Sequence, residues 1–179
     1  MANPIVPVFT QIFSILTVIG QFMILTAVVS ILIYRKRKNP LLAFAAKNAV
    51  LFALVVASIS MFGSLFYSEV ADYTPCELCW FQRILMYPQV LILLIAFKMK
   101  DKNVVNYSIA MSIIGIVIAS YHYLLQRGFA PAVCSSVGTS VSCSTTFVLQ
   151  YGYITIPMMS LTAFSMILMF ALIGKFYKK

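Results

Sequence analysis

Five apolar stretches, each close to the length of a membrane-spanning helix, constrain this chain more than any other feature. They cover residues 12–34, 49–67, 80–97, 104–125 and 153–174. A helix needs about 20 mostly apolar residues to cross the hydrocarbon core of a bilayer, and an open sheet cannot satisfy its backbone hydrogen bonds in lipid. We therefore predict an all-α integral membrane protein with five membrane-spanning helices.

The composition excludes a soluble enzyme. Of the 179 residues, 62% are apolar and only 9% are charged, whereas a soluble domain carries about 25% charged residues. The net charge of +9 comes from basic residues in short runs between the spans, which is the pattern of a topology signal in a membrane protein. We expect no nucleic-acid partner.

The positions of Lys and Arg predict the orientation of the chain. They gather after the first, third and fifth spans, at positions 35–47, 98–102 and 175–179. Short connections rich in Lys and Arg stay in the cytoplasm, so we predict that the N-terminus lies outside and the C-terminus inside. No small-residue cleavage site follows the first span, which favours an uncleaved anchor. All four cysteines then face the outer compartment, where disulfides form and persist.

The third span begins at a C-x-x-C motif, Cys76 to Cys79. Thr74 and Glu77 have the spacing of a capping box, and Pro75 suits the first helical position, so we predict that the helix begins at Thr74. This start would place Cys76 in the first turn, where the helix dipole favours a thiolate. A C-x-x-C at a helix start is typical of dithiol redox enzymes. An inert disulfide and half of a metal site are the alternatives.

Two ionisable side chains lie within the spans. Arg83 shares one helical stripe with Cys76 and Cys79, and an ionisable group inside a span indicates a functional role. It could stabilise the Cys79 thiolate and bind a carbonyl ligand, or it could extend to the lipid headgroups. His122, the only histidine, has a similar depth, so the two could line one pocket. An interfacial anchor is the other interpretation of His122.

A second cysteine pair, Cys134 and Cys143, lies in the one long outer connection. The segment between them is small and polar, so the ring closes easily. An exposed disulfide can exchange electrons with a nearby dithiol, although a structural staple is also possible. A zinc site of four cysteines would require two C-x-x-C pairs, and only one pair has that spacing.

Residues 75–83 (PCELCWFQR), residues 121–126 (YHYLLQ), the second cysteine pair and residues 154–158 (ITIPM) resemble the DsbB/BdbC family of quinone-dependent thiol oxidases. The resemblance covers about residues 49–174. It implies a four-helix antiparallel redox bundle in residues 41–179, and an additional N-terminal membrane anchor in residues 1–40. Such proteins take electrons from a DsbA/BdbD-like thioredoxin-fold thiol oxidase outside the membrane and pass them to a quinone. The sequence does not distinguish ubiquinone from menaquinone.

The resemblance also implies a role for each site residue. Cys134 would form the mixed disulfide with the partner, and Cys143 would be its bonded mate. Cys76 would take electrons from this pair, and Cys79 would lie next to the quinone. The residues similar to those beside the quinone in the family are Arg83 and His122.

Two other functions remain possible at this point. A vitamin K epoxide reductase-like enzyme also combines a helical bundle, a C-x-x-C and a quinone, but there the spaced cysteine pair precedes the C-x-x-C in the chain. A non-enzymatic membrane subunit with two structural disulfides is the second alternative. The register of Arg83 with the C-x-x-C argues against it.

Overall fold

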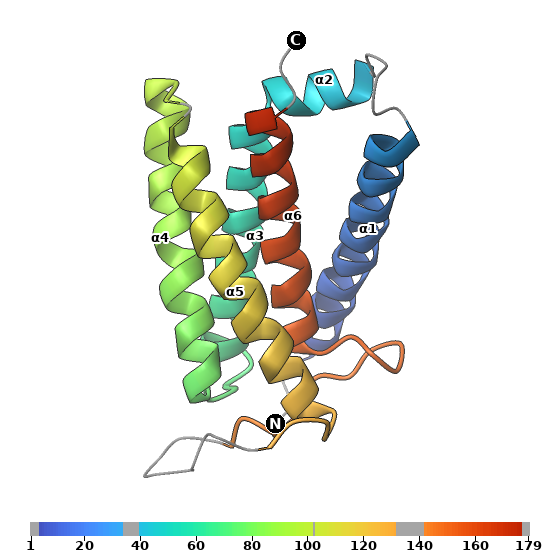
Figure 1. Ribbon diagram of the computed structural model, residues 1–179. Helices are drawn as coiled ribbons and strands as arrows, with labels where there is room; N and C mark the ends of the chain where they lie inside the picture. Colours follow the sequence, from blue (N-terminus) through green and yellow to red (C-terminus); the bar gives the residue numbers. More distant parts are fainter. Residues whose placement is uncertain (1–3, 34–39, 102, 132–141, 177–179) are drawn as a thin grey trace.

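The computed structural model is all-helical (Figure 1). It describes residues 4–33, 40–101, 103–131 and 142–176. No strand occurs in these residues. The helices are α1 (Ile5–Ile33), α2 (Pro40–Lys47), α3 (Ala49–Glu69), α4 (Glu77–Met99), α5 (Val104–Gln126) and α6 (Ile156–Phe176).

Five of the helices are long and apolar enough to span a membrane: α1, α3, α4, α5 and α6. The predicted fold class is therefore confirmed. The first helix begins at Ile5 and not at residue 12, because a proline such as Pro7 is tolerated in the first turn, where its missing N–H has no intrahelical acceptor. The short α2, which lies across one end of the long helices in Figure 1, was not predicted. It lies in the charged connection that joins the first two spans.

Helices α3, α4, α5 and α6 run alternately up and down and enclose the apolar core. Small residues on α3, such as Ala53 and Ala57, share one buried core cluster with larger ones on α6, such as Phe164 and Ile167. Small residues let membrane helices approach closely where no hydrophobic effect drives them together. These four helices are the bundle that holds the functional site.

Helix α1 lies outside this bundle, beside α6 (Figure 1). The stripe that it buries is polar or small: Thr10, Ser14, Thr17 and Gly20. The Ser14 hydroxyl donates to the carbonyl of Thr10 at 2.7 Å, so it brings no unpaired polar group into the membrane. Near the start of α1, the ring of Phe9 stacks on Phe66 of α3 with centroids 4.6 Å apart. Helix α1 is therefore packed against the bundle along one defined face.

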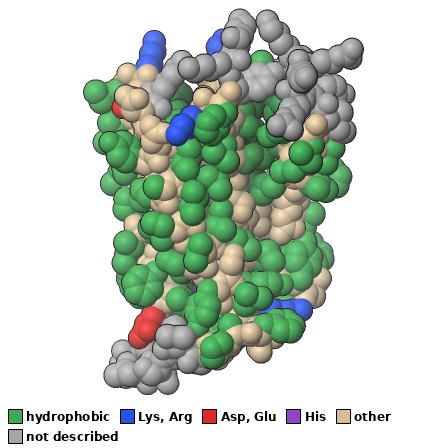
Figure 2. Space-filling view, in the orientation of Figure 1, with side chains coloured by type: hydrophobic (Ala, Val, Ile, Leu, Met, Phe, Trp, Pro, Cys, Tyr) green, Lys and Arg blue, Asp and Glu red, His purple; other side chains and the backbone are tan. Residues whose placement is uncertain are grey.

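Charged side chains occupy the two ends of the molecule, and a hydrophobic belt separates them (Figure 2). Among the described residues, Lys47, Lys98, Lys100 and Lys175 lie at the end that carries α2, whereas Arg127 lies at the opposite end, where α5 finishes. The belt is consistent with a membrane position, and the two ends differ in their basic charge.

The contact between α5 and α6 allows a test of this packing. A Cβ atom at Gly115 would lie 2.5 Å from the ring of Phe164, which is fully buried and cannot move aside. We expect Gly115→Ala to destabilise the protein by about 1–3 kcal/mol, measured as a lower midpoint of unfolding in SDS. Val117→Ile is the control, because it adds one carbon to a side chain that is 63% exposed. Equal midpoints for both variants would contradict this close approach.

Candidate functional site

The first turn of α4 differs from the sequence prediction. Thr74 does not begin the helix: the N-cap is Cys76, whose Sγ accepts a hydrogen bond from the backbone N–H of Cys79 at 3.4 Å. Cys76 is extended, with φ −78° and ψ 172°. Because the residue before a proline is held extended, Thr74 and Pro75 continue an extended segment that the helix cannot enter. The capping sulfur is therefore also one of the two candidate redox atoms.

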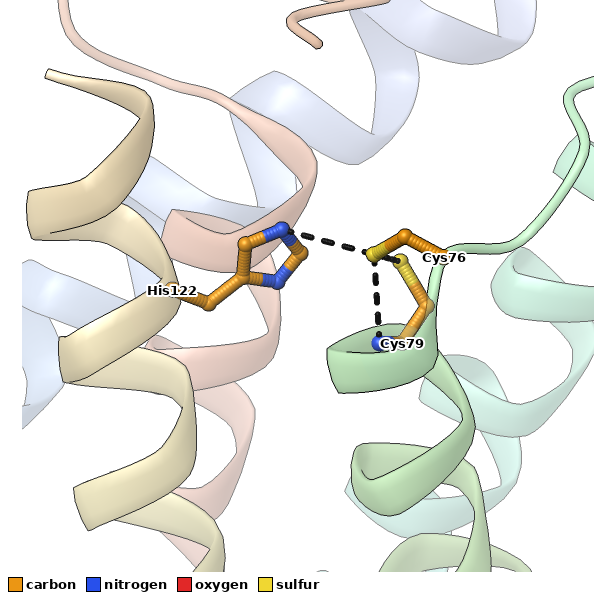
Figure 3. Close-up of side chains that lie close together, drawn as sticks. All are labelled: Cys76, Cys79 and His122. Atoms are coloured by element: carbon orange, nitrogen blue, oxygen red, sulfur yellow. Dashed lines mark hydrogen bonds between the residues drawn. The ribbon is translucent and has the colours of Figure 1, made fainter. Parts of the chain in front are cut away.

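The sulfur atoms of the C-x-x-C face each other at the start of α4 (Figure 3). The Sγ atoms of Cys76 and Cys79 are 2.7 Å apart. This separation lies between that of two sulfurs in van der Waals contact and the roughly 2.05 Å of a disulfide bond. The pair is therefore arranged so that a disulfide can form and break with little movement of the backbone.

His122 reaches this pair from α5 (Figure 3). It is buried, and its Nε2 lies 3.6 Å from the Sγ of Cys76 and 3.2 Å from the carbonyl oxygen of Cys143. Its Nδ1 lies 3.0 Å from the side-chain nitrogen of Gln82. An amide nitrogen only donates and a carbonyl only accepts. The contacts therefore require that Nδ1 is unprotonated and that Nε2 carries the hydrogen, which points toward Cys76 and Cys143.

Gln82 is a site residue that the sequence analysis did not identify. It lies one turn after Cys79 on α4 and is only 7% exposed. A buried amide needs a hydrogen-bond partner, and its partner is the imidazole of His122 on another helix. A glutamine inside an apolar span was the available signal, but its partner depends on how α4 and α5 pack.

The outer loop brings Cys143 to the same place. Cys143 is buried and belongs to a small apolar cluster with Cys76 and Leu125. The expected role of Cys134 falls on a residue outside the described part of the chain. The structure thus joins one member of the second cysteine pair to the C-x-x-C.

Arg83 reaches sideways to α3. Its Nε donates to the hydroxyl of Ser64 at 2.9 Å, and its Nη2 donates to the carbonyl of Ser64 at 3.0 Å. The guanidinium also lies over the ring of Trp80, 5.3 Å from its centroid. The side chain is therefore half-buried and held between α3 and α4. Among the described residues, Nη1 makes no hydrogen bond.

A cavity of about 380 Å³ opens beside these residues. Cys79, Gln82, Arg83 and His122 line it from α4 and α5, and α1, α3 and α6 supply most of its apolar wall. Its volume is in the range of small-molecule sites. Arg83 and His122 line this one cavity, as their similar depth suggested.

Comparison with known proteins identifies the family. Residues 46–174 match the family model described as disulfide bond formation protein DsbB. The chain belongs to the DsbB family. It is 46% identical over 132 residues to disulfide bond formation protein C of Bacillus subtilis, a match that covers 69% of this chain and 92% of that protein.

Other relatives of the DsbB family carry similar names. The chain is 45% identical to a probable disulfide formation protein of Oceanobacillus iheyensis over 68% of this chain and 85% of that protein. It is 40% identical to probable disulfide formation protein C of Halalkalibacterium halodurans over 71% and 93%. No solved structure matches significantly. The match to DsbB favours the disulfide-formation interpretation over the vitamin K epoxide reductase-like one, and it leaves α1 outside the matched region.

A metal site is the alternative use of these side chains in a DsbB-family protein. The ligand atoms of Cys76, Cys79 and His122 all lie within 4.8 Å of one another. Two thiolates on a tetrahedral zinc, each about 2.3 Å from the metal, are separated by about 3.8 Å, whereas these sulfurs are 2.7 Å apart. The histidine nitrogen nearest to them also carries a hydrogen. The arrangement fits a dithiol–disulfide pair better than a zinc site.

The thiol of Cys76 lies just outside the membrane-spanning part of α4. Its hydrogen bond with Cys79, followed by burial, raises the pKa of Cys76 from about 9 to about 12, against the opposing effect of His122. When the pair is reduced, Cys76 therefore keeps its proton at neutral pH and shares it with the neighbouring sulfur.

This cause of the raised pKa can be tested by removing the second sulfur. In a chain that also lacks Cys134 and Cys143, we expect Cys79→Ser to lower the pKa of Cys76. Each unit of that shift gives about tenfold more thiolate at a fixed pH well below the pKa. Alkylation of Cys76 by iodoacetamide, followed by mass spectrometry, should accelerate accordingly and reach its plateau at lower pH. Phe81→Leu, at a side chain that is 54% exposed and outside the cluster around Cys76, is the control, because it leaves both sulfurs and the burial of Cys76 in place. An unchanged pH profile would mean that burial alone sets the pKa.

Proposed function

We propose that this protein reoxidises a thioredoxin-fold thiol oxidase outside the membrane and passes the electrons to a membrane quinone. One observation carries the proposal: the Cys76–Cys79 pair stands between the buried Cys143 of the outer loop and a cavity lined by Arg83. A dithiol placed between a second cysteine and a ligand-sized cavity suits electron transfer from one to the other. Membership of the DsbB family supports the same reaction.

The proposed setting is the cytoplasmic membrane, with the N-terminus outside and the C-terminus inside. The end that carries α2 would face the cytoplasm, since it holds Lys47, Lys98, Lys100 and Lys175. The C-x-x-C and Cys143 lie at the opposite end, which would face the oxidising compartment.

The two sulfurs of the C-x-x-C differ in their surroundings, and this difference supports an order for the relay. Cys76 packs with Cys143, whereas Cys79 lines the cavity. Electrons would therefore enter at Cys76 from the loop pair and leave from Cys79. Cys134 would be the residue that attacks or is attacked by the partner, as in the proteins that this sequence resembles.

The proposed reaction balances in three exchanges. The partner's dithiol reduces the Cys134–Cys143 disulfide and becomes a disulfide. The two loop thiols then reduce the Cys76–Cys79 disulfide and re-form their own. The C-x-x-C dithiol is finally oxidised by the quinone, which takes up two electrons and two protons to become a quinol.

The side chains around the pair have defined tasks in this scheme. The Nε2–H of His122 points to Cys76 and would stabilise its departing thiolate when Cys134 resolves a mixed disulfide between Cys76 and Cys143. Gln82 holds His122 in that tautomer. Arg83, fixed through Ser64, offers its Nη1 hydrogens to a carbonyl oxygen in the cavity and places a positive charge near Cys79.

Trapping the partner tests both the relay order and the orientation. Cys143→Ala leaves Cys134 free to attack a disulfide-bonded thioredoxin-fold oxidase, so a mixed disulfide should accumulate on non-reducing gels. It should form with oxidase added to right-side-out vesicles and not to inverted ones. Cys134→Ala should abolish the adduct. If the adduct forms mainly at Cys76, the loop pair is structural and the proposed order is wrong.

The arginine tests the quinone step. Arg83→Met keeps the apolar stem but loses a charge-assisted hydrogen bond of about 1.5–3 kcal/mol, so the apparent KM for quinone should rise about ten- to a hundredfold. Mixed-disulfide formation at Cys134 should stay near the parent level. Arg83→Lys should recover only part of the loss, because a point charge cannot replace the planar fork. Arg127→Met, at the exposed end of α5, is the matched control.

The quinone assay also decides between the proposed thiol:quinone oxidoreductase and a non-enzymatic membrane subunit. A parent chain that shows no quinone reduction with a reduced partner, and whose Arg83→Met variant behaves identically, would be better described as a membrane subunit with structural disulfides. The assay follows quinol formation in detergent, after thiol counting has established the starting redox state of all four cysteines.

A further inference from the structure

Helix α1, which lies outside the residues matched by the family, forms one wall of the cavity beside the C-x-x-C. The lining residues that it supplies are Phe13, Leu16, Thr17, Ile19, Gly20 and Met23. They follow one another at helical spacing over about three turns. A helix whose only task was to anchor the chain would not need to line the functional cavity.

The cavity is long and has one polar end. Along α3 its lining extends from Tyr67, near the C-x-x-C, to Phe52, near the basic end of the molecule. At about 1.5 Å per residue this path measures roughly 22 Å. The Arg83 guanidinium and the His122 ring lie at its outer end. The inner part is lined by apolar side chains: Phe52, Val55, Val56, Ile59, Met166 and Phe170.

The positions of the polar and apolar lining residues indicate what kind of ligand fits the cavity. A molecule with one polar, carbonyl-bearing end and one long apolar chain would satisfy both parts of the cavity at once. The hydroxyls of Thr17 and Thr162 on the way do not change this, since both already donate to carbonyls one turn back in their own helices. A ring-only ligand would leave the inner part without contacts.

We propose that α1 is the wall that holds the prenyl tail of the quinone, whose ring lies near Cys79 and Arg83. The inference rests on the proposed function, because it takes the quinone as the ligand. Its added content is that this chain uses its additional helix to build a tail site. That site would distinguish quinones by their tails, while the four-helix bundle would recognise the ring.

The wall is held in place by specific contacts. A Cβ atom at Gly20 would lie 2.6 Å from the sulfur of Met166 on α6, so the two helices approach closely there. The next residue, Gln21, donates to the hydroxyl of Thr162 at 3.3 Å and accepts from the hydroxyl of Tyr153 at 2.9 Å. These contacts fix α1 where membrane lipid offers no hydrophobic drive for association.

The proposal is tested with a double variant designed to narrow the tail site without changing the residues around the ring. Leu16→Phe with Ile19→Phe enlarges two wall residues, and Ile15→Phe with Val18→Phe is the matched control. Neither control residue lines the cavity, and their exposures of 44% and 39% are close to the 41% and 50% of Leu16 and Ile19, so the two pairs differ in their position relative to the cavity and not in burial. Each protein is assayed with long-tailed menaquinone and long-tailed ubiquinone, and with each of the two rings lacking the tail. Saturable quenching of Trp80, the only tryptophan, gives binding independently of turnover.

We expect the wall variant to raise the apparent KM and the quenching midpoint for the long-tailed quinone about tenfold, as overpacking of a filled site should. Both values for the tailless ring should stay within about twofold of the parent, and the control should resemble the parent with both ligands. Equal effects on the two ligands, or no effect on either, would overturn the inference while leaving quinone reduction by the parent intact. Tail-dependent binding without any reduction by the parent would reject the proposed function and retain the tail site.

Discussion

The rest of the site depends on the hydrogen bonds that the imidazole of His122 makes. It is buried on α5, yet its two nitrogens contact groups from α4, from the helix cap and from the outer loop. A buried imidazole must satisfy both nitrogens, and the amide nitrogen of Gln82 and the carbonyl of Cys143 each admit only one protonation pattern. The histidine therefore determines how the C-x-x-C, Gln82 and the loop carbonyl of Cys143 lie relative to one another.

Hydropathy and spacing predicted the parts of the fold that depend on the chain itself. The five spans follow from the hydrocarbon thickness, and the pairing of Cys76 with Cys79 follows from their separation. Three features required tertiary information. The start of α4 depends on a sulfur cap that replaces the expected Thr74 cap. The partner of Gln82 lies on α5, and the partner of Arg83 lies on α3. The site residues were thus predictable as candidates, but their hydrogen bonds were not.

Helix α1 adds a wall to the cavity of the four-helix bundle. Its buried stripe of Thr10, Ser14, Thr17 and Gly20 is inconspicuous in the sequence, because small polar residues look like weak points in an apolar span. In a membrane these residues allow close packing, and Ser14 and Thr17 satisfy their hydroxyls within their own helix. The expected division into residues 1–40 and 41–179 stays a prediction. The cavity is formed by both parts.

The cap of α4 links the redox state to the helix itself. The sulfur of Cys76 is the side-chain acceptor for the amide of Cys79, and it is also an atom that would gain or lose a covalent bond during turnover. Forming the disulfide would draw that sulfur from 2.7 Å to about 2.05 Å from the sulfur of Cys79 and so shift it relative to the amide that it caps. The first turn of α4 should consequently differ between the oxidised and the reduced protein, so that hydrogen–deuterium exchange at the single backbone amide of Cys79 reports the redox state of the pair.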